Sequence, residues 1–158
     1  MPRKLTHCTL LSLVAVCVFS LASCGNYMKL SGEITRVRVV ETGGPRNVIV
    51  VEFEATNTAK VGYIVREAEV VITHGDEVTT GDSIAVRDAA NMCQHMAALG
   101  GDCAEPLLTR QTIAPGETVT RLVAASFSMT ADQLRERDKL VLRVLELDRL
   151  ATEFTEAE

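Results

Sequence analysis

Residues 47–56, NVIVVEFEAT, alternate between two kinds of side chain. One face carries the apolar residues Ile49, Val51, Phe53 and Ala55, and the other carries Glu52 and Glu54. Successive side chains of a β-strand point to opposite faces of the sheet, so this period of two predicts a strand. Alternation with one polar face is typical of a half-buried strand in an antiparallel sheet.

The flanking sequence continues the same pattern. Residues 62–73 alternate again, with Ile64, Ala68, Val70 and Ile72 predicted on one face and Glu67 and Glu69 on the other. Further strands are predicted at residues 33–41, 78–80, 119–127 and 139–147. Turns are predicted at residues 43–45, 74–77 and 114–117, the last with Pro115 and Gly116 in the positions that a type II turn requires.

Two segments interrupt the strands. Residues 88–99 are rich in Ala, Met and Gln and precede Gly100-Gly101, which predicts a short helix with a glycine stop. Residues 130–137 predict a second short helix, with Thr130 as its N-cap and Gln133 as the capping-box partner.

These elements predict a mainly β fold, an immunoglobulin- or fibronectin-III-like antiparallel β-sandwich. The sandwich is expected over residues 31–150, with a helical, cysteine-containing insertion at 88–106 and the second helix before the last strand. Residues 151–158 are acidic and are expected to be frayed.

Residues 50–83 resemble small envelope domains of the fibronectin-III type. The pieces that carry the resemblance are Val51–Asn57 (VEFEATN), Val61–Ile72 (VGYIVREAEVVI) and Gly75–Ser83 (GDEVTTGDS). They are similar to FxLYD-type modules and to the water-stress domain of late-embryogenesis-abundant group 2 proteins, although the insertion at 88–106 is not part of that pattern. The resemblance implies a non-catalytic module in which Asn57 satisfies backbone groups at a strand end. A surface turn is the alternative for Asn57.

The first 23 residues have the three parts of a secretion signal. Arg3 and Lys4 are followed by an apolar stretch at residues 10–21, and the leader ends in Leu21-Ala22-Ser23-Cys24. This ending resembles the lipobox of bacterial lipoproteins, which implies cleavage before Cys24 and acylation of Cys24, for example with palmitate. The apolar stretch of about 12 residues is shorter than the roughly 20 that a membrane span needs.

The resulting mature chain is expected to be anchored in the cell envelope by the lipid on Cys24. Residues 24–30 form a short tether. Gly25, by resemblance to enteric lipoproteins, favours the periplasmic face of the outer membrane. Removal of the leader leaves 14 basic and 21 acidic residues, a net charge of −7. This charge argues against nucleic acid as a partner.

Cysteine usage predicts one disulfide. Of the five cysteines, Cys8 and Cys17 leave with the signal and Cys24 receives lipid, so Cys93 and Cys103 remain in an oxidising compartment. A soft-metal site for Cu(I) or Zn(II) is the alternative, since thioether, thiolate and imidazole groups gather here. Its ligands would be Met92, Cys93, His95, Met96 and Cys103. The spacing matches no established zinc motif, so no metal or other cofactor is assigned.

Two other motifs are weaker. Gly81-Asp82-Ser83-Ile84 is similar to the nucleophile block of GDSL-type hydrolases, but no histidine follows His95 to act as the base. His74 could form a pH-sensitive pair with Asp76 or Glu77, or could simply be exposed in a turn.

The sequence therefore predicts a membrane-anchored, non-enzymatic module that binds another envelope protein or assists assembly. The candidate surface is the insertion with its flanks, residues 87–108, because a long insertion in a compact domain often carries function. The alternative is a soft-metal or redox accessory protein that uses Cys93, His95 and Cys103.

Overall fold

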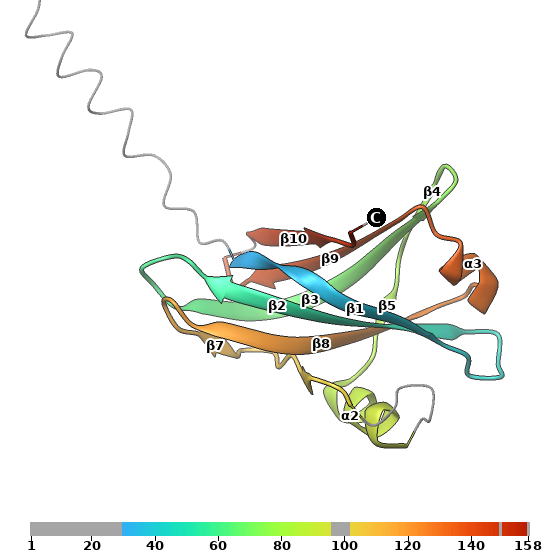
Figure 1. The fold of residues 1–158 in the computed structure, drawn as a ribbon, viewed down its shortest axis with the longest axis horizontal. Coiled ribbons are helices and arrows are strands. Elements are labelled where there is room, and N and C mark those ends of the chain that lie inside the picture. The colour runs from blue at the N-terminus through green and yellow to red at the C-terminus, as the bar shows by residue number, and fades with distance from the viewer. Residues whose placement is uncertain (1–29, 96–101, 149, 158) are drawn as a thin grey trace, which may run out of the picture.

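A computed structural model describes residues 30–95, 102–148 and 150–157. The predicted signal, Cys24 and the predicted tether up to residue 29 lie outside the described residues. The described chain forms two packed β-sheets with two short helices (Figure 1). The mainly β fold predicted from the sequence is confirmed.

The first sheet has four strands in the order β1-β2-β8-β5, and a short fifth strand, β6, pairs with β8. The pairs along this path are antiparallel, and β6 alone runs parallel to its partner. The strands span Leu30–Val40 (β1), Asn47–Asn57 (β2), Thr118–Phe127 (β8), Asp82–Ser83 (β5) and Glu105–Pro106 (β6).

The second sheet has the order β10-β9-β3-β4, and the short strand β7 pairs with β3. Its strands span Ala151–Thr155 (β10), Lys139–Glu146 (β9), Tyr63–His74 (β3), Glu77–Thr80 (β4) and Thr112–Ile113 (β7). The two orders correspond to strands A-B-E-D and G-F-C of the immunoglobulin fold, with β4 added at the edge of the second sheet.

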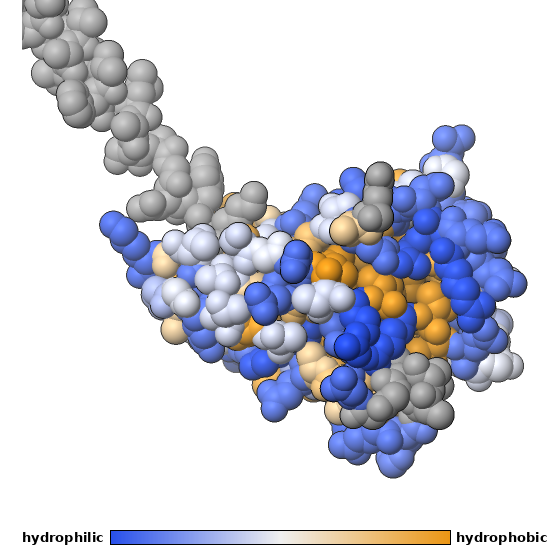
Figure 2. Space-filling view, in the orientation of Figure 1, coloured by the Kyte–Doolittle hydropathy of each residue, from blue (hydrophilic) through white to orange (hydrophobic). Residues whose placement is uncertain are grey.

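The main core lies between the inner faces of the two sheets. In β2 the inward residues are those that the alternation predicts, Ile49, Val51, Phe53 and Ala55. The ring of Phe53 lies 5.6 Å from that of Phe154 in the opposite sheet, measured between centroids. Figure 2 shows apolar surface near the middle of β1. Val37 and Val39 of β1 are only partly buried against the core.

Strand β3 differs from the prediction in its first half. The pairing of β3 with β9 shifts register between Val65 and Glu67. A bulge of this kind inserts one extra residue and reverses the faces on either side of it. Tyr63 and Val65 therefore belong to the core together with Val70, and the prediction that Ile64 shares that face is wrong.

The prediction of a frayed C-terminus is also wrong. Residues 151–155 form β10, in which Thr152 and Phe154 are buried. The acidic residues between and after them hide this short alternation in the sequence. The sandwich consequently extends to Thr155, and helix α3 (Ala131–Arg135) precedes the last two strands instead of the last one.

Local signals at turns and caps are confirmed. Gly116 has a φ of 76°, and the Glu117 N–H donates to the Ala114 carbonyl over 3.0 Å, which closes the predicted turn. Thr130 and Gln133 form the capping box of α3.

Asn57 is structural. Its buried side chain donates to the carbonyls of Val61 and Ile113, both at 2.8 Å, and its Oδ1 accepts from the Ala59 N–H. The surface alternative for Asn57 is therefore wrong.

Candidate functional site

Helix α2 (Val86–His95) lies against the outer face of the first sheet, the face that points away from the main core (Figure 1). It begins two residues before the predicted start, and the predicted end at Gly100-Gly101 lies outside the described residues. The helix and the segment after it cover a second, smaller apolar cluster. Its buried members are Val40, Val48, Val50, Ala89, Cys93, Leu122 and Ala124. Strand β2 is therefore buried on both faces for most of its length.

A disulfide joins the helix to the segment that follows it. Cys93, near the end of α2, is bonded to Cys103, and the two Cα atoms are 5.9 Å apart. Cys93 is buried and faces the sheet beside Ala89, while Met92 and Cys103 pack at the edge of the cluster. The predicted Cys93–Cys103 bond is present, and it closes a loop with a sequence separation of 10 residues.

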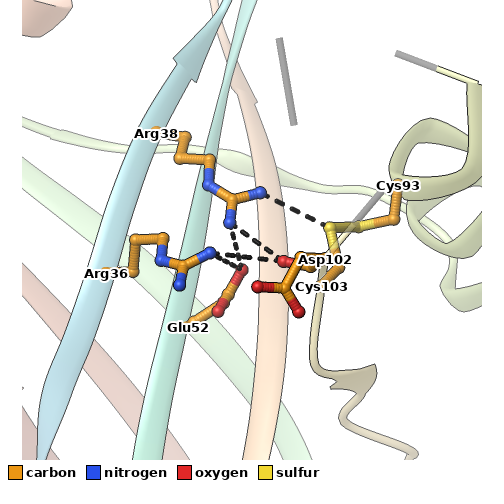
Figure 3. Close-up of a disulfide and its surroundings, with 6 residues drawn as sticks. All are labelled: Arg36, Arg38, Glu52, Cys93, Asp102 and Cys103. Atoms are coloured by element: carbon orange, nitrogen blue, oxygen red, sulfur yellow. Dashed lines mark hydrogen bonds and ion pairs between the residues drawn. A yellow bond between two sulfur atoms is a disulfide. The ribbon is translucent and has the colours of Figure 1, made fainter. Parts of the chain in front are cut away.

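Two arginines of β1 bind the same segment, and both also lie beside a glutamate of β2. Figure 3 shows Arg36 and Arg38 pointing from β1 toward Glu52 of β2 and toward the chain at Asp102 and Cys103. Nη2 of Arg38 lies 3.2 Å from Oε1 of Glu52, and Nη1 of Arg36 lies 3.9 Å from the same oxygen. Glu52 is buried, so the nearby guanidinium groups compensate a carboxylate that would otherwise be costly to bury.

The arginines also hold the backbone of the insertion. Both donate to the Asp102 carbonyl oxygen, Arg36 over 3.2 Å and Arg38 over 3.0 Å. Nη1 of Arg38 further donates to the Cys103 sulfur over 3.6 Å. The insertion is thus fixed at Cys103 by a covalent bond and at the preceding residue, Asp102, by charge-assisted hydrogen bonds.

Sequence reasoning missed this arrangement. Glu52 was expected only on a polar face, yet it lies under the insertion and opposite Arg36 in the β1–β2 register. The signal was the pair of arginines two residues apart on the neighbouring strand. That signal can be used only when the register of the two strands is known.

A cavity of about 210 Å³ opens between α2, β3 and β8. Its wall is about equally polar and apolar, and the apolar lining residues include Val65, Ala68, Ile84, Leu107 and Leu122. Ser83 of β5 lies in the same wall, but no histidine is among the lining residues that the structure describes. The hydrolase hypothesis therefore has a serine here without the base that the chemistry requires.

The possible metal ligands are only partly brought together. Both thiols are used in the disulfide, so neither is available as a thiolate. His95 is exposed at the end of α2, and Met96 lies outside the described residues. Over residues 30–95, 102–148 and 150–157, no group of three or more His, Cys, Asp or Glu side chains is placed to hold a metal ion.

His74 lies at the end of β3, opposite Glu77 across the β3–β4 hairpin. In the described part of the chain it forms no ion pair with Asp76 or Glu77, and its Nδ1 has no hydrogen-bond partner. The pH-sensitive pair proposed for this turn thus has no contact to support it.

Comparison with known proteins adds little to this geometry. No family model matches the chain, and no curated protein matches it. A crystal structure of a Bordetella pertussis protein provisionally assigned as ApaA is similar over 81% of this chain and 88% of that chain. The identity is 15% and the TM-score is 0.37. None of the helices that the structure describes is long and apolar enough to cross a membrane.

Proposed function

We propose that this protein is a lipid-anchored, non-catalytic envelope module that binds a partner protein through the outward surface of the insertion. The observation that supports the proposal is the double attachment of the insertion to the outer face of the sheet. Apart from Leu107, no residue of 87–108 belongs to the main core, and α2 packs instead over the second apolar cluster on the outer face of the first sheet.

Apart from the exposed Val86, the outward surface of α2 is polar and mixed in charge. Ala89 and Cys93 face the sheet, whereas Arg87, Asp88, Asn91, Gln94 and His95 are exposed. A helix that is held in one position by a disulfide and by Arg36 and Arg38 loses little freedom when a partner binds, which lowers the entropic cost of association. A small polar surface of this kind suits a transient protein–protein contact.

Membrane attachment is the other half of the proposal. It is supported by the leader and its ending Leu21-Ala22-Ser23-Cys24, which resembles a lipobox. Two or three acyl chains on Cys24 would hold the protein stably, since a single chain gives only marginal binding. The module would then present the insertion to partners in the periplasm or at the cell surface.

The partner surface can be tested by photo-crosslinking in intact cells. A photoreactive residue is placed at Asn91 or at Gln94 of α2, and at Glu77 of β4 as an exposed control. We expect one common adduct from both helix positions and no such adduct from Glu77. An adduct of equal yield from Glu77, or none from the helix, would overturn the assignment of the insertion as the partner surface.

The soft-metal alternative can be separated in the same preparation. It requires the Cys93–Cys103 bond to open, because a thiolate and not a disulfide sulfur is the metal ligand. Copper(I) and zinc(II) are titrated into the oxidised and the reduced mature protein. Binding of one ion per chain to the reduced form would favour the metal or redox function over the binding module.

A further inference from the structure

A second unusual surface lies at the end of the sandwich where β1 begins. Three large apolar side chains protrude there, Val61 and Leu147 at 53% exposure each and Leu150 at 39%. They are half of the six large apolar side chains that are exposed in the described part of the chain. We call this surface, defined by Val61, Leu147 and Leu150, the apolar tip.

Hydrogen bonds place the three residues at one end of the fold. The Leu147 N–H donates to the carbonyl of Ile64 over 3.0 Å, three residues after Val61. The Glu146 N–H donates to the Leu150 carbonyl over 2.8 Å and closes the β9–β10 connection. Figure 1 shows the β2–β3 and β9–β10 connections at the end of the sandwich where β1 begins.

The first described residue lies beside this tip. The N–H of Leu30 donates to Oγ1 of Thr152, two residues after Leu150, over 3.2 Å. The chain that leads back to Cys24 therefore leaves the sandwich next to the apolar tip. Leu30 is the sixth residue after Cys24, and a chain of that length reaches about 20 Å at most.

Hydrogen bonds from buried side chains fix the backbone of both turns that form the apolar tip. The Val61 carbonyl is bound by the buried side chain of Asn57. On the other connection, Oε2 of the buried Glu146 accepts from the Asp148 N–H over 2.8 Å. A buried polar side chain thus fixes the backbone of each turn. The apolar side chains of both turns are therefore held in positions that expose them to solvent.

We propose that the apolar tip docks into the headgroup layer of the membrane that holds the lipid anchor. The inference rests on the proposed lipidation of Cys24, since it is the short connection to an anchored residue that brings the tip to a bilayer. Apolar side chains lower their free energy on leaving water for the interfacial region. Lys60, next to Val61, is exposed and suits anionic headgroups, while Asp148 opposes it, so the apolar side chains carry the contact.

Docking would orient the whole module. With the tip in the membrane surface, the long axis of the sandwich stands away from the bilayer. The β3–β4 hairpin, where Val78 of β4 is 67% exposed, would then lie at the far end (Figure 1). Val78 is therefore a natural control, since it is an exposed apolar residue of the same kind that the proposal keeps out of the membrane.

The test uses the lipidated protein reconstituted into vesicles of phosphatidylethanolamine and phosphatidylglycerol. Single cysteines replace Val61, Leu147 or Val78 and carry an environment-sensitive fluorophore. Cys24 is blocked by lipid and Cys93 is bonded to Cys103. We expect a blue shift, and quenching by nitroxide-labelled lipids, at positions 61 and 147 but not at position 78.

The two proposals fail in different ways. Protein that stays in the soluble fraction of the cell, as the Cys24→Ser variant is expected to do, would contradict the lipid anchor itself. Membrane-bound protein with equal quenching at positions 61 and 78, or with no quenching at 61 and 147, would overturn only the docking of the tip. As a second arm, the triple variant Val61→Ser, Leu147→Ser and Leu150→Ser should remain membrane-bound, and a probe at the partly buried Ala59 should lose its quenching.

Discussion

The two faces of β2 are both buried, but by different means. The inner face, with Ile49, Val51 and Phe53, packs against the opposite sheet, as in any two-layer sandwich. The outer face, with Val48 and Val50, is covered by α2 and its disulfide-linked extension. The comparison shows that one strand can pack against the opposite sheet on one face and hold the insertion on the other.

The largest expected effect is on the inner face. Replacement of Phe53 by alanine removes a fully buried ring that contacts Phe154 across the core, and we expect a loss of about 3–5 kcal/mol in the free energy of unfolding. Urea denaturation followed by circular dichroism measures it. A loss below about 1 kcal/mol would show that the two sheets do not depend on this contact.

The disulfide tests the outer face. The paired change Cys93→Ala and Cys103→Ala should cost about 2–3 kcal/mol, because it restores conformational freedom to a short loop in the unfolded chain. Hydrogen exchange in β3 and β9, which follows global unfolding, should accelerate only as far as this loss of global stability requires, whereas α2 and Leu107 should lose more protection than that. Equal loss of protection in both sheets would mean that the two faces of β2 are not independent.

The smallest effect comes from two neighbouring valines, which give the sharpest comparison. Val50 is 2% exposed on the outer face and Val51 is 0% exposed on the inner face. Each change to alanine should cost about 1–2 kcal/mol in the disulfide-bonded protein, from the buried methyl groups that it removes.

A double-mutant cycle separates the two valines. In the protein without the disulfide, the cost of Val50→Ala should shrink because the insertion covers it less tightly, while the cost of Val51→Ala should not change. Coupling of the same size for both valines would contradict the separation of the two faces.

Much of the inner architecture was predictable from local sequence. The alternation in β2, the Pro115-Gly116 turn and the Thr130 capping box are short-range signals, and each is confirmed. The Cys93–Cys103 bond was predictable by elimination, because the other three cysteines were assigned to the leader and the anchor.

The parts that were missed depend on contacts between distant segments. The bulge at Val65 in β3 has no local signal, and β10 was hidden by acidic residues around Thr152 and Phe154. The burial of Glu52 followed from the register of β1 against β2 and from the place where the insertion comes to lie. The alternation of a strand indicates which face a polar residue occupies. It does not indicate which other segment of the chain will cover that face.

The position of the disulfide also has a consequence for how the chain matures. Cys93 and Cys103 are close neighbours in sequence, and with the leader removed and Cys24 acylated they would be the last two free thiols. Two thiols allow a single intramolecular pairing, whereas four allow three. Such a chain could be oxidised as it emerges from the translocation machinery without any need for a disulfide isomerase. The lipid on Cys24 would thus also act as a protecting group during folding.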